Sequence, residues 1–235
     1  LGDNVVVAVL DTGVDDTHPD LVDRTLRGYN FIDDTAVTAD DNFHGTACAS
    51  LIAGNGTSAE SAAGIAPGAW ILPVKVMDGN GRGNSFAVIE GIVYAVDRGA
   101  DVISISLGSR GDSPALHDAV DYALDRDVVV VAAAGNEGGE SILIPARYDD
   151  VICVGAVDGA YRHAPFSNRG TPVDIVAPGV GVYTAAPGGE YLSFTGTSAA
   201  APYVAGIVAG LRAEFPHDTR DEIRTRLLAA ADDLG

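Results

Sequence analysis

The sequence is poor in lysine and in long apolar runs, and each shortage argues against a class of protein. Its 14 basic residues, with Lys75 the single lysine, stand against 33 acidic residues and give a net charge of −19. Contact with phosphates requires a basic face, so this charge argues against nucleic acid as a partner. No apolar run approaches the roughly eighteen residues of a membrane-spanning helix, so we expect no membrane span.

Cysteine is also scarce. Cys48 and Cys153 are the only two cysteines, too few for a disulfide framework. Both stand in apolar segments, where a free cysteine packs as a small hydrophobic side chain. We therefore expect two buried thiols.

The acidic, lysine-poor composition is open to three interpretations. It suits adaptation to high salt, where counterions screen the self-repulsion of the chain. It is equally typical of an ordinary acidic secreted protein from a high-GC genome that replaces lysine with arginine. As a third interpretation, the acidity attracts basic peptides.

The apolar pattern predicts the fold class. A chain of 235 residues that is 47% hydrophobic suits a single domain with a full core. Short apolar runs, typical of strands buried on both faces, alternate with helical segments. We predict a doubly wound α/β fold, with a mostly parallel sheet and helices on both faces. The predicted helices are 44–54, 84–98, 113–126, 198–214 and 218–231, and the predicted strands lie within 5–10, 101–108, 128–131 and 151–154.

Ser198 stands in the most informative segment, Gly-Thr-Ser-Ala-Ala-Ala-Pro over 196–202. A serine just after a glycine turn, at the start of a small apolar segment, is presented at a helix N-terminus. The free N–H groups there favour negative charge, which a nucleophilic serine and its oxyanion both need. Taken alone, the segment could equally be a helix cap beside tight packing.

Two further segments supply what a nucleophilic serine needs. The apolar run 5–10 ends in Asp11-Thr12-Gly13, which places a carboxylate at the carboxyl end of a strand. His44 begins a small-residue helical segment. Taken alone, Asp11 is more readily interpreted as a cap or turn residue. His44 is more readily interpreted as a surface residue or a core residue whose hydrogen bonds are satisfied. Together, in the chain order Asp, His, Ser, the three make those readings improbable.

With this order the chain resembles the subtilisin-like serine proteases, the subtilase family. The resemblance runs along nearly the whole chain and predicts a single catalytic domain over 1–235, trimmed at both ends relative to typical members. The matching segments are Val-Leu-Asp-Thr-Gly-Val-Asp at 9–15, His-Pro-Asp-Leu at 18–21, His-Gly-Thr at 44–46, Ser-Leu-Gly at 106–108, Ala-Ala-Ala-Gly-Asn at 132–136, Pro-Gly at 178–179 and Gly-Thr-Ser at 196–198.

The resemblance implies a role for each residue of the site. Ser198 would attack the peptide carbonyl, His44 would take and return its proton, and Asp11 would orient the imidazole. Asn136 and the Ser198 N–H would bind the oxyanion. Read without the resemblance, Asn136 is a left-handed turn residue after Gly135.

The resemblance also implies substrate-binding segments. Ser106, Leu107 and Gly108 would pair with the peptide backbone as an added strand, with Gly81, Arg82 and Gly83 on its other side; both are otherwise ordinary turn sequences. Ala133, Gly135 and the loop after Asn136 would line the pocket for the residue before the scissile bond. Leu143 would floor this pocket and favour modest side chains over large aromatic ones.

Structural calcium is the cofactor that the resemblance implies, with no organic cofactor. Asp20 matches a carboxylate ligand of the family's strong site, whose loop corresponds to 55–63. One customary ligand has no counterpart, and Asp20 could also be a turn carboxylate. Ala146, Tyr148 and Val151 match the backbone carbonyls of a weaker cation site, which would suit Ca²⁺ or Na⁺.

The resemblance therefore implies an extracellular, monomeric endopeptidase of broad specificity that acts on peptides or proteins, with an inhibitory propeptide as a partner. One alternative is a narrow-specificity processing protease of the maturation or kexin-like kind. A second is a subtilase-like binding module without catalysis. The third, an α/β nucleotide-binding protein, is weakest, because the glycine-rich segment 79–83 lacks the GxGxxG and Walker spacings.

Overall fold

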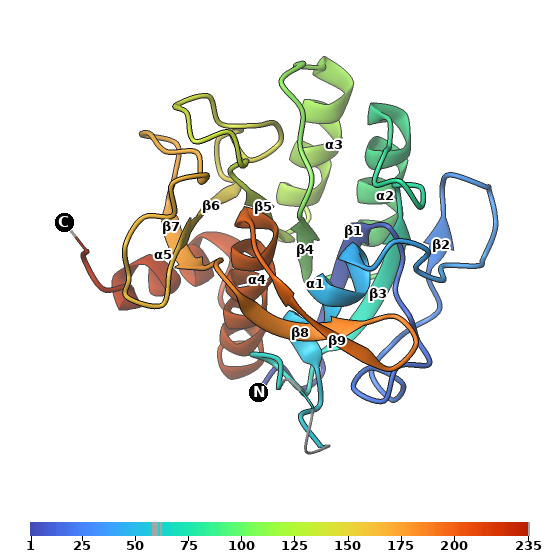
Figure 1. The fold of residues 1–235 in the computed structure, drawn as a ribbon. Helices are drawn as coiled ribbons and strands as arrows, with labels where there is room; N and C mark the ends of the chain where they lie inside the picture. The colour runs from blue at the N-terminus through green and yellow to red at the C-terminus, as the bar shows by residue number, and fades with distance from the viewer. Residues whose placement is uncertain (58–60, 62, 235) are drawn as a thin grey trace.

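A seven-stranded parallel sheet forms the centre of the molecule, in a computed structural model that describes residues 1–57, 61 and 63–234. The strand order is β2-β3-β1-β4-β5-β6-β7, and every neighbouring pair is parallel (Figure 1). The strands are β1 (Val6–Asp11), β2 (Tyr29–Asn30), β3 (Trp70–Lys75), β4 (Val102–Ile105), β5 (Val129–Ala133), β6 (Ile152–Val157) and β7 (Ile175–Pro178).

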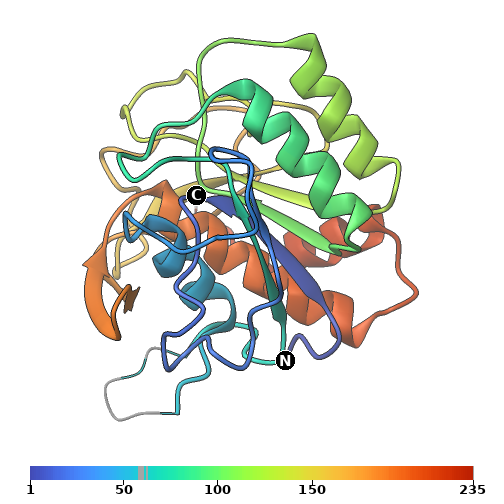
Figure 2. The same ribbon diagram turned by 90° about the vertical axis from the view of Figure 1, so that its right-hand side faces the viewer.

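Helices cover both faces of this sheet (Figure 2), and two separate apolar clusters fill the space between the layers. One face carries α1 (His44–Ala53), α4 (Thr197–Glu214) and α5 (Arg220–Ala230). The other carries α2 (Ser85–Asp97) and α3 (Pro114–Leu124). The predicted doubly wound α/β class is confirmed, and all five predicted helices are present with nearly the predicted ends.

The strand order places a crevice between β1 and β4. From β1 the chain crosses to β2 at one edge, returns to β3 beside β1, and then crosses to the other side, where it adds β4 to β7 in order. Such a reversal leaves an opening at the carboxyl ends of the two central strands, where open α/β sheets bind ligands. Asp11 ends β1, and Ser106 directly follows β4.

Several strands are absent from the sequence prediction. Pro73 interrupts the apolar run of β3, and proline is unusual inside a strand. The antiparallel hairpin of β8 (Val182–Ala186) and β9 (Glu190–Phe194) turns at Gly188 and Gly189, which both have positive φ. The hairpin lies beside α1 (Figure 1), where the Thr184 hydroxyl donates to the carbonyl of Ala47.

The predictions about the two cysteines and about membrane-spanning segments can be compared with the structure. Cys48 and Cys153 are both free and buried, which confirms the expectation of two buried thiols. Within the described ranges, the helices are all too short or too polar to cross a bilayer.

Candidate active site

Asp11 and His44 form a close pair at the crevice. The His44 Nδ1 atom lies 2.8 Å from one Asp11 carboxylate oxygen and 2.9 Å from the other. Asp11 is buried and also accepts the Thr12 N–H, whereas the His44 side chain keeps 20% of its surface exposed. The ring of Phe194 in β9 packs against the imidazole in a T-shaped arrangement, with the two ring centroids 5.2 Å apart. The carboxylate thus orients the ring, and the face away from it stays open to the cleft.

Asp40 fixes the start of the helix that carries His44. The residue preceding α1, Phe43, makes no side-chain cap, and Asp40 supplies the missing acceptor. Its carboxylate accepts the N–H groups of Asn42, Phe43 and Thr46 at 2.9–3.1 Å. The hydroxyls of Thr12 and Thr46 also donate to it. A carboxylate at a helix N-terminus satisfies free donors and complements the dipole.

Thr12 extends this network to strand β1. Its hydroxyl accepts the Gly45 N–H at 3.0 Å while donating to Asp40. The buried Lys75 donates to the Thr12 carbonyl and pairs with Asp41 at 2.6 Å. Sequence analysis missed these positioning residues. The signal available was an aspartate a few residues before a predicted helix.

We expect Asp40→Ala to lower the free energy of unfolding by about 1–3 kcal/mol, because it removes a helix cap and leaves half-buried N–H donors unpaired. Urea unfolding in the Ser198→Ala background, which prevents autolysis, measures this. The exposed Asp16 is the matched control, and Asp16→Ala is expected to change stability by less than about 0.5 kcal/mol. Equal effects of the two substitutions would contradict the capping role.

Ser198 is the second residue of α4, in the first turn, where N–H groups have no partner within the helix. Its hydroxyl donates to the Ser106 carbonyl at 3.1 Å. Within the described chain no hydrogen bond joins it to His44, so the hydroxyl would have to turn for His44 to take its proton. The Cys48 thiol of α1 lies between His44 and the first turn of α4. Its Sγ atom is 3.8 Å from His44 Nδ1 and 3.5 Å from the Ser198 carbonyl oxygen.

Asn136 follows β5 and lies beside the start of α4. Its side-chain oxygen accepts the N–H and the hydroxyl of Thr197 at 2.8 and 3.0 Å. These two bonds fix the orientation of the amide. A β-carbon built on Gly196 would lie 3.4 Å from the Asn136 Nδ2 atom. The amide NH₂ donates to no acceptor in the part of the chain that the structure describes, so it is available to a ligand.

The pair with Asp11 changes the protonation of His44. Burial acts to lower the pKa of the imidazole, but the charge and hydrogen bond of Asp11 outweigh it and raise the pKa well above 6.5. The imidazolium therefore persists to higher pH than for a free histidine. A general base must be neutral, so a rate that depends on His44 falls as the pH drops through this raised pKa.

We expect the acid limb of kcat/KM to have its midpoint above pH 6.5, the ordinary histidine value. Asp11→Asn removes the charge that raises the pKa, so the residual activity of that variant is expected to show a lower midpoint. Initial rates on a neutral peptide across the pH range give both midpoints. A wild-type midpoint at or below 6.5 would contradict the electrostatic coupling.

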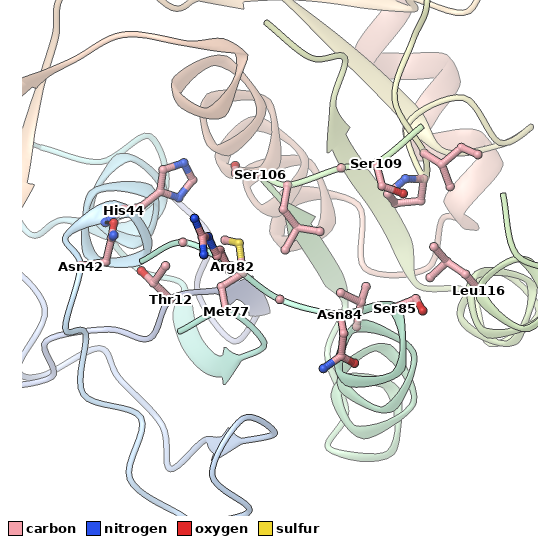
Figure 3. A pocket seen from close by; sticks show the side chains of 17 residues that line it. Thr12, Asn42, His44, Met77, Arg82, Asn84, Ser85, Ser106, Ser109 and Leu116 are labelled. Carbon is pink, nitrogen blue, oxygen red and sulfur yellow. Dashed lines mark hydrogen bonds between the residues drawn. The ribbon is translucent and has the colours of Figure 1, made fainter. Parts of the chain in front are cut away.

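A cleft of about 600 Å³ leads away from His44 (Figure 3). One wall is the segment 81–85, and the other is the segment 106–109. Thr12, Asn42 and His44 lie at one end, and Leu116 lines it farther along. The six residues predicted to flank a peptide all line this cleft: Gly81, Arg82, Gly83, Ser106, Leu107 and Gly108.

Ala133, Gly135 and Leu143 do not line this cleft. Leu143 instead lies between Gly108 and Gly135. A β-carbon built on Gly108 would lie 2.8 Å from Leu143 Cβ, and one built on Gly135 would lie 2.8 Å from Leu143 Cγ. The Leu143 N–H also donates to the Ala134 carbonyl. This leucine therefore occupies the gap between Gly108 and Gly135.

Asp20 is buried, and both of its carboxylate oxygens accept hydroxyl hydrogen bonds. Ser61 donates at 2.5 Å and Tyr191 at 3.1 Å. Each oxygen keeps a further lone pair beside these bonds, and the assignment of Asp20 as a calcium ligand stays a prediction. The predicted loop 55–63 falls partly outside the described residues.

The weaker predicted cation site lies in the turn that holds Ala146, Tyr148 and Val151. The Tyr148 carbonyl already accepts the Val151 N–H, at 3.3 Å. The assignment of this turn as a cation site stays a prediction.

The arrangement defines a class of protein. The Cys48 thiol contacts both an imidazole held by a buried carboxylate and a serine at a helix N-terminus. An amide whose NH₂ group has no acceptor among the described residues lies beside the start of the same helix. On a doubly wound α/β fold, with the chain order Asp, His, Ser, this is the arrangement of a serine hydrolase of the subtilisin type.

Comparison with known proteins agrees with this class. The model of the subtilase family matches residues 2–235. A thermophilic serine proteinase of Bacillus sp. (strain AK1) is 44% identical over 97% of this chain and 56% of its own length. Thermitase of Thermoactinomyces vulgaris is 43% identical over 90% of this chain and 76% of its own. A crystal structure of a cold-adapted subtilisin-like serine proteinase superposes with a TM-score of 0.93 at 33% identity, covering 99% of this chain and 84% of that one.

The chain belongs to the subtilase family. Its relatives are named serine proteinases and subtilisins, so the enzyme class is serine endopeptidase. The chain spans little more than half of the length of the thermophilic proteinase.

Proposed function

We propose that this chain is a secreted endopeptidase of broad specificity that hydrolyses peptide bonds through Asp11, His44 and Ser198. The observation that carries the proposal is the contact of His44 Nδ1 with both oxygens of the buried Asp11. It fixes the tautomer that leaves Nε2 free to accept a proton, and it stabilises the imidazolium that results.

The reaction follows from these positions. The Ser198 hydroxyl turns from the Ser106 carbonyl, its oxygen bonds to the peptide carbonyl carbon, and its proton passes to His44 Nε2. The oxyanion accepts the Ser198 N–H and the Asn136 amide. The C–N bond then breaks as His44 gives the proton to the leaving amine. Water repeats the sequence on the acyl-enzyme and releases the acid.

A fluorophosphonate probe tests the proposal directly, because it labels only a serine activated by an assembled site. Intact-mass analysis is expected to show one adduct, mapped to Ser198 and absent from Ser198→Ala. The reaction is run in dilute buffer and in molar salt with calcium. Absence of an adduct from folded protein in both buffers would refute the proposal and favour a non-catalytic binding module.

The same pair of buffers addresses the acidity of the chain, whose net charge is −19. If the charge reflects adaptation to high salt, peptide hydrolysis is expected to rise with salt as counterions screen the self-repulsion. Full activity in dilute buffer that falls steadily as salt rises would contradict this adaptation.

Leu143 is the basis of a proposed preference for modest side chains at the residue before the scissile bond. It fills the gap between Gly108 and Gly135, where a large aromatic ring would otherwise enter. We expect Ala and Leu substrates to exceed the matched Phe substrate in kcat/KM. Leu143→Ala is expected to raise the Phe-to-Leu ratio about tenfold, the usual scale for a few methylenes in an apolar pocket.

Leu116 provides the control for this prediction. It lines the cleft but is not one of the side chains that approach Gly108 or Gly135, so Leu116→Ala is expected to leave the Phe-to-Leu ratio unchanged. A clear preference of the wild type for Phe would contradict the role of Leu143. A library profile with one sharp preference would favour the narrow processing protease instead.

A further inference from the structure

The charge of the cleft is opposite to that of the molecule. The chain has a net charge of −19, yet none of the 17 residues that line the cleft is an aspartate or a glutamate. Of these lining side chains, His44 titrates and Arg82 is permanently cationic. A peptide in the cleft therefore meets a local positive charge on an acidic protein.

The backbone at Arg82 is held in place by a tight turn. The Asp78 carboxylate accepts the N–H groups of Asn80 and Arg82, both at 2.9 Å. The Asp78 N–H donates to the Arg82 carbonyl at 2.8 Å, and Met77 bridges to Gly83 across the turn. These bonds fix the main chain at Arg82 and hold this residue on the cleft wall.

Among the described residues the Arg82 guanidinium forms no ion pair, although it interacts electrostatically with the nearby Asp78 carboxylate. The side chain is exposed, and no carboxylate lies within ion-pair distance of it in the described structure. Asp78 is occupied by backbone donors, and Asp41 pairs with Lys75. Arg82 lies on one wall of the cleft, and Ser106 and Ser109 lie on the opposite wall (Figure 3). A substrate strand would pair with the wall that contains Ser106.

We infer that Arg82 is a specificity-determining residue that selects peptides with an aspartate or glutamate side chain at the position facing segment 81–83. This inference rests on the proposed function. A bound strand presents alternate side chains to each wall, and a guanidinium binds a carboxylate with paired N–H donors. The remote carboxylates of the chain are screened beyond a Debye length of about 8 Å at physiological salt, whereas a contact pair is not.

Matched peptides test this inference. A set identical except for Glu, Gln or Lys at each position on the acyl side of the scissile bond is assayed at about 0.15 M and about 1 M salt. The wild type is expected to prefer Glu over Gln by about two- to fivefold in kcat/KM at one position, the scale of an exposed ion pair. The preference is expected to shrink in the higher salt, to disappear in Arg82→Gln and to reverse in Arg82→Glu.

Arg98→Glu is the charge control. It changes the net charge by the same amount as Arg82→Glu, but it lies at the end of α2 and does not line the cleft, so its Glu preference is expected to persist. Equal rates on Glu, Gln and Lys peptides, or a preference for Lys, would overturn the inference while leaving peptide hydrolysis intact. Failure to cleave even the Gln peptides would refute the proposed function itself.

Discussion

Asp11→Asn is expected to lower kcat by about 10⁴ with little change in KM. That magnitude is the one known for the triad aspartate in serine proteases, subtilisin included. An asparagine in the place of Asp11 would offer its NH₂ group to the His44 Nδ1 atom that now lies 2.8 Å from a carboxylate oxygen. The imidazole would then favour the tautomer with its proton on Nε2, which cannot accept the serine proton.

The experiment compares kcat and KM for peptide hydrolysis by the wild type and by Asp11→Asn, at a pH well above the acid limb. Asp16→Asn is the matched control: it makes the same chemical change at an exposed aspartate in the loop that follows β1 and is expected to leave kcat within a factor of about two. The near-ultraviolet circular dichroism of both variants reports whether the fold is retained. A folded Asp11→Asn enzyme with nearly normal kcat would refute the assigned role.

Asn136→Ala carries the second largest expected effect, a fall in kcat of about 10²–10³, the loss known for the equivalent oxyanion donor in subtilisin. Thr197 holds the Asn136 oxygen with two hydrogen bonds, which leaves the NH₂ group as a preorganised donor. A donor that meets charge only in the transition state affects kcat and leaves KM nearly unchanged.

Asn80→Ala is the control for this prediction. Asn80 is an exposed amide in the turn beside the cleft and does not line it, so its loss is expected to leave both kcat and KM unchanged. If Asn136→Ala instead raised KM at constant kcat, the amide would bind the substrate in its ground state and not the oxyanion.

The elements that could be predicted from sequence share a local origin. Buried parallel strands such as β1 and β5 are continuous apolar runs, and the five helices have small or amphipathic segments with recognisable ends. The strand β3 and the hairpin β8–β9 were missed for equally local reasons. Pro73 breaks the apolar run of β3, and only four of the ten strand residues of the hairpin are buried, so its hydrophobic signal is weak.

The sequence by itself determined the residue types and chain order of the candidate triad, the fold class and the two free thiols, because each depends on short segments. Only the tertiary structure decided how these segments meet. The strand order brings Asp11 and Ser106 to one crevice, Asp40 reaches forward to cap the helix of His44, and Leu143 enters the gap between two distant glycines. The absence of carboxylates from the cleft lining is likewise tertiary. Such contacts join residues far apart in the chain, and their geometry is set by how helices pack on a twisted sheet.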